Sequence, residues 1–236
     1  MTQKSIRWYS ALFSIFCFSV QAEEPREERL PVVTAHHTDS PIVLDGKLDE
    51  EAWSRAQPIK LEKVLKSGEV VQQLSTVVRT LWSDEYLYIS YVAPYTELTT
   101  FDPPIFQGKR VGLWDADVVE VFINVNPDRA LNEYTEYQVA PTGEKLDLSL
   151  RLPERDFCWN SGFEAAVHLD TDKKIWTTEL RIPLSALGKV KPAAGMRWRI
   201  NYYRHAISDK VFLAWNPTQT DSAHTPERFG ILEFIK

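Results

Sequence analysis

Residues 114–127, with the sequence WDADVVEVFINVNP, carry the pattern from which the fold can be predicted. Between positions 118 and 125 apolar side chains fill nearly every place, and only Glu120 and Asn124 interrupt them. Such a run is typical of a strand that is buried on one face and partly covered on the other. Trp114 precedes it, and a large aromatic ring there either plugs the end of a core or forms a platform for a flat ligand such as a sugar ring. Composition alone favours the plug.

Shorter segments on both sides of this run also have strand patterns. Residues 76–82 and 86–92 are rich in β-branched and aromatic side chains and flank a Ser-Asp-Glu turn, which predicts a hairpin. Residues 145–152 alternate apolar and polar side chains, as a half-buried strand does. Further strands are predicted at 42–44, 133–139, 175–182, 197–203 and 229–234.

About nine to eleven short strands with little helix predict an all-β protein, an antiparallel β-sandwich of the immunoglobulin-like kind. One or two short helical turns are expected. One follows Asp49, a candidate N-cap, and ends with Trp53 folded back into the core, and the other lies at 184–187. Residues 96–113 include two prolines and two glycines without a sustained apolar pattern, so we expect a long surface loop that leads to Trp114.

The first 22 residues have the features of a secretory signal peptide. Lys4 and Arg7 supply a positive start, an apolar run too short to span a bilayer follows, and a small-residue cleavage site ends at Ala22. Lipidation at Cys17 is disfavoured because the bulky Phe16 precedes it. We therefore expect cleavage after Ala22 and a secreted or periplasmic protein with no transmembrane segment.

Behind the signal peptide at 1–22 we expect a flexible charged lead at 23–30 and a single β-sandwich domain at 31–236. The charge balance argues against nucleic acid as a partner. The chain has 27 Lys and Arg against 33 Asp and Glu, and removal of the two positive charges in residues 1–22 lowers the formal net charge from −6 to −8. A surface that follows phosphates needs clustered basic residues, whereas these are scattered and outnumbered.

Cysteine use adds one expectation. Only Cys158 remains after cleavage, so no intramolecular disulfide can form despite the oxidising destination. We expect Cys158 to be a small buried hydrophobe beside Trp159 rather than a reactive thiol.

Four separated motifs occur along the chain: IVLDGKLDEEAW at 42–53, LWSDEYLYI at 81–89, WDADVVEVFI at 114–123, and WNP at 215–217 followed by PERFGIL at 226–232. Together and in this order they resemble the carbohydrate-binding module family 9. That family shares a wider β-sandwich superfamily with the DOMON domains, which bind haem or sugar. The resemblance covers the chain from about Pro31 and implies a DOMON-like sandwich that binds carbohydrate without catalysis.

The resemblance also implies site residues. In sugar-binding members two tryptophans sandwich the terminal sugar of a glycan, while an acid and an arginine on nearby strands bind its hydroxyls. Trp114 matches the first tryptophan and Glu120 matches the acid. The arginine position is occupied by Gln138, which can form hydrogen bonds but lacks the charge and the bidentate fork of arginine.

The position of the second tryptophan is occupied by Ala223. The sandwich would therefore be open unless another aromatic ring, Trp159 or Trp215, fills the gap. His224 follows Ala223 and could contact a ligand, although a lone loop histidine is more often a structural hydrogen-bonding group.

Sugar-binding relatives carry calcium in acid-rich turns, so the resemblance makes Asp45, Asp49 and Asp84 candidate calcium ligands, without a regular calcium-loop spacing. No other cofactor is assigned, since the sequence has neither a His/Cys cluster for zinc nor a Gly-rich phosphate loop. Acid pairs such as Asp115 and Asp117 usually face water, and we assign no catalytic residue.

A b-type haem in an electron-transfer domain of the DOMON kind is the alternative function that the superfamily allows. Met196 would be one axial ligand, and His168, His205 or Lys210 would be the other. A methionine that fills a gap at the edge of a sheet is the simpler interpretation.

The sequence therefore predicts a secreted, non-catalytic carbohydrate-binding protein that serves polysaccharide recognition or breakdown. Its ligand would be an oligo- or polysaccharide bound on an aromatic platform, and a glycan-degrading enzyme such as a glycoside hydrolase is the candidate protein partner.

Overall fold

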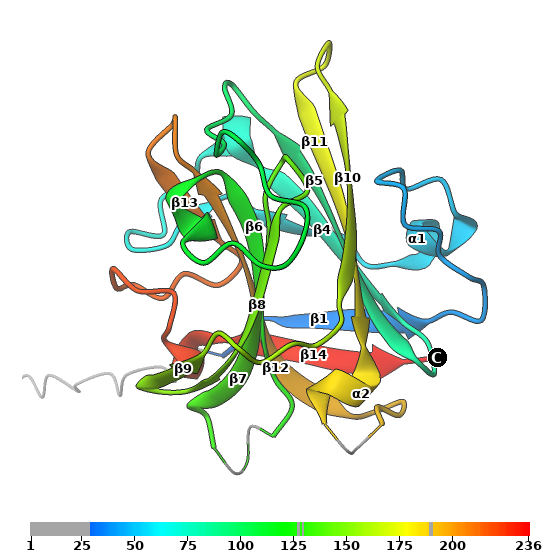
Figure 1. Ribbon diagram of the computed structural model, residues 1–236. Coiled ribbons are helices and arrows are strands. Elements are labelled where there is room, and N and C mark those ends of the chain that lie inside the picture. The colour runs from blue at the N-terminus through cyan, green and yellow to red at the C-terminus, as the bar shows by residue number, and fades with distance from the viewer. Residues whose placement is uncertain (1–28, 127, 129, 189–190) are drawn as a thin grey trace, which may run out of the picture.

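The computed structural model describes residues 29–126, 128, 130–188 and 191–236. The expected signal peptide and residues 23–28 of the expected lead lie outside them. Within the described residues, 14 strands form one continuous sheet that curls into two layers (Figure 1). The predicted all-β sandwich is confirmed, with more strands than the nine to eleven expected. No helix in the described part of the chain is long and apolar enough to cross a membrane.

The strands are β1 (Val32–His37), β2 (Ile59–Leu61), β3 (Lys63–Val64), β4 (Thr76–Trp82), β5 (Tyr86–Pro94), β6 (Val118–Asn124), β7 (Glu133–Val139), β8 (Lys145–Arg151), β9 (Glu154–Asp156), β10 (Glu164–Asp170), β11 (Ile175–Pro183), β12 (Arg197–Ala206), β13 (Val211–Ala214) and β14 (Gly230–Ile235). The α-helices in the described ranges are the short α1 (Glu51–Arg55) and α2 (Leu184–Leu187). Three 3-10 turns, η1 (Gln72–Leu74), η2 (Leu113–Asp115) and η3 (Pro226–Arg228), lie between strands.

The order of the strands explains the two layers. One layer contains β10, β11, β5 and β4, the other contains β12, β6, β7, β8 and β9, and β1 with β14 continues the hydrogen bonding between them. In Figure 1, β1 and β14 run across the lower part of the view, where the two layers meet. Neighbouring strands are antiparallel except at β1, which pairs in parallel with both β4 and β14.

The main core lies between the layers. Val119, Val121 and Ile123 of β6 point into it and share it with side chains of the facing layer such as Ile89 and Leu180. The alternate residues of β6 point to the outer face, where a second apolar cluster is covered by η2, by β13 and by the loop before β14. Every residue of β6 is buried, so the predicted covered strand is confirmed and its outer face is also enclosed.

The segment before α1 differs from the prediction in two ways. Residues 42–44 form no strand, although Ile42 is buried in a small apolar cluster on the outer side of β4 and β5. Helix α1 is preceded by Glu50 as its N-cap residue rather than by Asp49, and the cap makes no side-chain hydrogen bond. The predicted core position of Trp53 is confirmed, since only 3% of it is exposed.

Glu179 of β11 attaches this segment to the sheet. Its buried carboxylate accepts hydrogen bonds from the backbone N–H groups of Asp45 at 3.2 Å and Gly46 at 2.8 Å and from Nε1 of Trp53 at 3.1 Å. Gly46 has φ +80° and lies against the backbone of β10 at His168, where a side chain would not fit. Burial raises the pKa of Glu179 to about 7, against the opposing effect of these donors.

Cys158 corrects another expectation, because it is exposed rather than buried. The turn after β9 explains this placement. Asp156 Oδ1 accepts hydrogen bonds from the backbone N–H groups of Cys158 at 2.9 Å and Trp159 at 3.1 Å, and the turn leaves the Cys158 side chain on the surface.

Replacing Glu179 by Gln should lower the free energy of unfolding by about 1–3 kcal/mol, because an amide offers one acceptor oxygen where three donors converge. Urea denaturation of the two proteins measures the difference. Glu164→Gln is the control, since Glu164 forms a partly exposed ion pair with Arg181 at 2.6 Å and such pairs contribute little. Equal midpoints for wild type and Glu179→Gln would show that Glu179 is not the attachment point.

Candidate ligand-binding pocket

A pocket of about 210 Å³ opens on the outer face of the layer that contains β6, β7 and β8. Its floor consists of alternate side chains of these strands: Glu120 and Phe122 from β6, Glu136 and Gln138 from β7, and Leu148 from β8. Its walls and rim are Trp114, Arg155, His205, Phe212, Asp221, Ser222, Ala223 and His224. The strands that build the main core thus also position the pocket.

Strand register places two acids side by side on the floor. Glu120 is directly opposite Gln138 in the β6–β7 ladder, and Glu136 is the next residue of β7 on the same face. Glu120 and Glu136 are therefore diagonal neighbours across the two strands. Both are 3% exposed.

Burial dominates the electrostatics of this pair. It raises the pKa of Glu120 well above its ordinary value, and the neighbouring Glu136 raises it further. Burial also raises the pKa of Glu136 to about 7, while the hydrogen bond from Gln138 and the positive charge of Arg155 act in the opposite direction. The two carboxyl groups therefore do not both ionise easily at neutral pH.

Three buried polar atoms around the pocket have no hydrogen-bond partner among the described residues: Glu136 Oε2, Gln138 Oε1 and His205 Nε2. Nε2 of Gln138 donates to Glu136 Oε1 at 2.5 Å, which leaves the amide oxygen of Gln138 free. Nδ1 of His205 lies 2.9 Å from the carbonyl oxygen of Trp114. Burial lowers the pKa of His205, so the ring is neutral, Nδ1 donates and Nε2 keeps its lone pair. Gln138 Oε1 and His205 Nε2 are therefore acceptors, and Glu136 Oε2 is a third acceptor when this carboxyl group is ionised.

Trp114 lies at one side of the pocket on η2 and is half-buried. Gly112, with φ +87°, turns the long loop into η2. The Trp114 ring packs against the second apolar cluster and against Phe157, whose ring centre is 6.3 Å away at an angle of 40°. Trp114 therefore covers part of a core and also contributes to the pocket lining, and its role as a platform for a ligand stays a prediction.

His224 forms another wall. Its ring stacks on Phe122 with a centre distance of 5.2 Å and an angle of 22°. The hydroxyl of Tyr134 lies 2.7 Å from Nδ1 of His224. Burial lowers the pKa of His224 to about 4, so the ring is neutral and accepts this hydrogen bond from Tyr134.

The structure brings Trp114, Glu120, Gln138 and His224 together in one pocket, together with Ala223 at the predicted gap. Trp159 and Trp215 do not line it. Trp159 lies in a separate groove between β7, β8, β9 and α2. Trp215 packs directly on Gly230 and against Tyr202. Neither tryptophan fills the gap at Ala223.

The pocket also contains residues that the sequence did not single out, among them Glu136, Arg155 and His205 as a lining residue. Glu136 could have been found by alternation, because it stands two residues before Gln138 on the same strand. Arg155 carried no such signal, since its strand has three exposed charged residues and no apolar pattern.

The candidate calcium ligands do not form a cluster that could hold a metal ion. Asp45 accepts the backbone N–H of Lys47 at 2.8 Å, and Asp84 lies 3.3 Å from His37 Nε2. The described residues include no group of three or more His, Cys, Asp or Glu side chains that could hold a metal ion. The donor set predicted at Asp45, Asp49 and Asp84 does not form such a group, so calcium stays a prediction without a defined site.

The haem alternative finds no support in the positions of its ligands. Met196 immediately precedes β12, and His205 is near the other end of the same strand, which places them about 30 Å apart. One iron cannot bind both residues. Met196 packs against the main core, as the gap-filling interpretation expects, and His168 and Lys210 are exposed.

The fold is a β-sandwich with a polar pocket on its outer face. Residues 44–236 match the family described as carbohydrate family 9 binding domain-like. The chain therefore belongs to that family, as the motifs predicted.

Two relatives and two solved structures extend the comparison. An extracellular protein of Arthroderma benhamiae is 25% identical over 68% of this chain and 78% of its own length. Endo-1,4-beta-xylanase A of Thermotoga maritima is 23% identical over 89% of this chain, which spans only 18% of the xylanase. Among solved structures, a proposed carbohydrate-binding protein of Bacteroides uniformis has a TM-score of 0.69 at 17% identity, covering 86% of this chain and 98% of its own. A family 9 carbohydrate-binding module of Caldicellulosiruptor kristjanssonii, in complex with cellotriose, has a TM-score of 0.64 at 20% identity. The match covers 87% of this chain and 94% of the module.

The buried acid pair makes a testable contribution to the pH dependence of stability. The folded protein holds the Glu136 proton up to a pH of about 7, whereas the unfolded chain releases it near 4.5, so this group lowers stability as pH rises between those values. Replacing Glu136 by Gln keeps the acceptor for Gln138 and removes the titration. The fall in unfolding free energy from pH 5 to pH 8 should then be smaller by about 2 to 3 kcal/mol than in wild type.

Urea denaturation at both pH values tests this expectation. Glu133→Gln is the matched control, because Glu133 is exposed on the same strand and pairs with Arg151 at 2.9 Å. A Glu136→Gln protein whose stability changes with pH as wild type does would contradict the assignment.

Proposed function

We propose that this protein is a secreted, non-catalytic carbohydrate-binding protein that recognises neutral sugar units in the pocket beside Trp114. The observation that carries the proposal is the convergence of three buried polar atoms without partners in the described chain beside a half-buried tryptophan; all three are acceptors when Glu136 is ionised. A ligand that enters must supply O–H or N–H donors to those atoms, because leaving them unpaired costs free energy. A sugar supplies hydroxyl donors at its edge and an apolar C–H face for an aromatic ring.

The carboxylates of the pocket support binding rather than hydrolysis. A glycosidase places its two carboxyl groups on either side of the scissile bond. Glu120 and Glu136 instead lie next to each other on one face of one sheet, with Gln138 beside them. In that arrangement both acids reach the same edge of a ligand, which suits the recognition of neighbouring hydroxyls.

The relatives support a role in polysaccharide recognition. This chain matches 18% of the length of a xylanase, and a family 9 module of Caldicellulosiruptor kristjanssonii is solved in complex with cellotriose and in complex with glucose. Cellotriose, xylotriose and glucose are therefore the first ligands to test, and a glycan-degrading enzyme is the candidate partner. The signal-peptide pattern at 1–22 and an extracellular relative support secretion or export to the periplasm.

Trp114→Ala should weaken binding of the best of these ligands about tenfold or more, because the stacking contact of about 1 kcal/mol and the covered area are lost. Isothermal titration calorimetry measures the affinity. Since Trp114 is half-buried, its replacement should lower the thermal midpoint less than Trp53→Ala, which removes a ring that is 3% exposed.

Phe106→Ala is the control, since Phe106 belongs to the same long loop and is 73% exposed. Its affinity should equal that of wild type. A folded Trp114→Ala protein with wild-type affinity would place the recognition site elsewhere, and a wild-type protein that binds none of the three ligands or insoluble cellulose and xylan would refute the proposed function.

A further inference from the structure

The interior of the pocket offers acceptors, and one side chain at its rim offers charged donors. Arg155 is the single Lys or Arg among the described residues that line the pocket. Its side chain is exposed and makes no hydrogen bond or ion pair with the described chain. A guanidinium has five N–H donors in a fixed planar fork, so these donors are available to a ligand.

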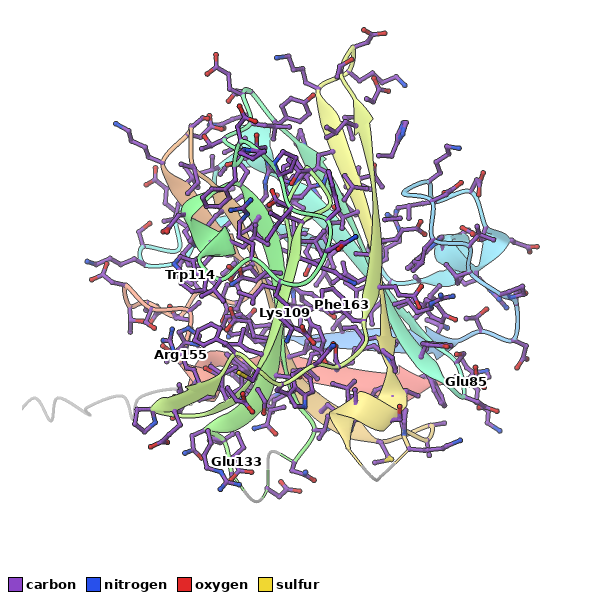
Figure 2. The ribbon with its side chains drawn as sticks, in the orientation of Figure 1. Glu85, Lys109, Trp114, Glu133, Arg155 and Phe163 are labelled. Carbon is purple, nitrogen blue, oxygen red and sulfur yellow. The ribbon has the colours of Figure 1, made fainter. Side chains whose placement is uncertain are left out.

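The register of a short edge strand places Arg155 at this rim. In the β8–β9 hairpin Arg155 is opposite Leu150, which belongs to the apolar cluster under the pocket. The flanking residues Glu154 and Asp156 point to the other face and line the separate groove near Trp159. A slip of one residue in this hairpin would exchange the two faces. Figure 2 shows Trp114 and Arg155 on the same side of the molecule, with Arg155 below Trp114.

The positive charge of Arg155 shifts the pKa values of two groups that line the pocket. It lowers the pKa of Glu136 on β7, and it also lowers the pKa of His224 in the loop before η3. The other charged groups of the lining are Glu120 on β6 and Asp221, which pairs with Lys66 at 2.8 Å, while the rings of His205 and His224 are neutral. Arg155 therefore lines the same pocket as the two acids of its floor and acts electrostatically on one of them, Glu136.

We propose that Arg155 is a specificity-determining residue that acts together with Glu136 on a sugar hydroxyl or on two neighbouring ones. This inference rests on the proposed function. A hydroxyl both donates and accepts, so it can donate to Glu136 Oε2 while its oxygen accepts from Arg155. The charged donor that Gln138 cannot supply from β7 thus comes from β9, a different strand.

The arrangement also selects the ligand class. A neutral sugar satisfies both the acidic floor and the basic rim. A uronic acid would bring another carboxylate to a floor where burial already disfavours the ionised form of Glu120 and of Glu136. The site should therefore prefer neutral glycans over glucuronic acid.

Isothermal titration of the purified protein with cellotriose, xylotriose and glucuronic acid tests the proposal. Arg155→Gln should weaken binding of the neutral ligand about tenfold or more, as expected for loss of a hydrogen bond to a charged group. Arg155→Lys should restore only part of it, because lysine keeps the charge without the planar fork. The double variant Arg155→Gln with Gln138→Arg should bind more tightly than Arg155→Gln alone, since it returns the guanidinium from the neighbouring strand.

A second readout separates ligand contact from a purely structural role. In Arg155→Gln the pKa of Glu136 should rise, so the pH at which neutral-ligand affinity changes should move upward. Arg151→Gln is the matched control, because Arg151 belongs to the same hairpin, pairs with Glu133 and lines the other groove. Its affinity and pH profile should equal those of wild type.

The outcomes are distinguishable. If wild type binds a neutral ligand and folded Arg155→Gln binds it equally well with an unchanged pH profile, the role of Arg155 is refuted and the proposed function stands. If glucuronic acid binds more tightly than the neutral ligands, the inferred ligand class is refuted. If wild type binds none of these probes and also fails to bind glucose, cellulose and xylan, both the inference and the function on which it rests fail.

Discussion

Strand β6 is covered on both faces, and much of the remaining structure follows from this constraint. Its inward side chains complete the core between the layers, while its outward side chains need a second cover. That cover is made of η2, β13 and the loop before β14. It is incomplete at Glu120, and the gap is the pocket. The position of the pocket is therefore a consequence of how a doubly buried strand is enclosed.

The polar groups at this gap lower the free energy of unfolding of the ligand-free protein. An unsatisfied buried polar atom costs about 1–3 kcal/mol, and three of them lie here. One of the three belongs to Glu136, which with Glu120 forms the acid pair whose ionisation burial disfavours. A core of similar shape with apolar side chains would be more stable. Unsatisfied polar groups of this kind are typical of binding sites. They lower the stability of the free protein, and a bound ligand supplies the missing partners.

The sequence predicted the parts of the fold that depend on local patterns. The hairpin of β4 and β5, the strand β8 and the single-turn helix α2 match their predicted positions, because side-chain alternation and turn residues determine them. Segments that depend on distant partners were missed. β1 pairs with β14 at the other end of the chain, and β10, in which no residue is fully buried, is held as a strand by its pairing with β11. Residues 42–44 have a strand composition but form no ladder; the N–H of Val43 donates to Glu50, and those of Asp45 and Gly46 donate to Glu179.

The residues of the candidate site also fall into two groups, those that the sequence predicted and those that depend on the folded structure. Trp114, Glu120 and Gln138 were identified by motif resemblance, and strand register brings them together. Arg155 and the free acceptor of His205 depend on hairpin register and on a hydrogen bond to a backbone carbonyl, which no local pattern encodes.

The most direct test of the account is a crystal structure of the protein with cellotriose. The account predicts a sugar beside Trp114 with hydroxyl oxygens about 2.6–3.2 Å from Glu136 Oε2, Gln138 Oε1 and His205 Nε2. A sugar bound instead in the groove beside Trp159, with these three atoms facing only water, would contradict it.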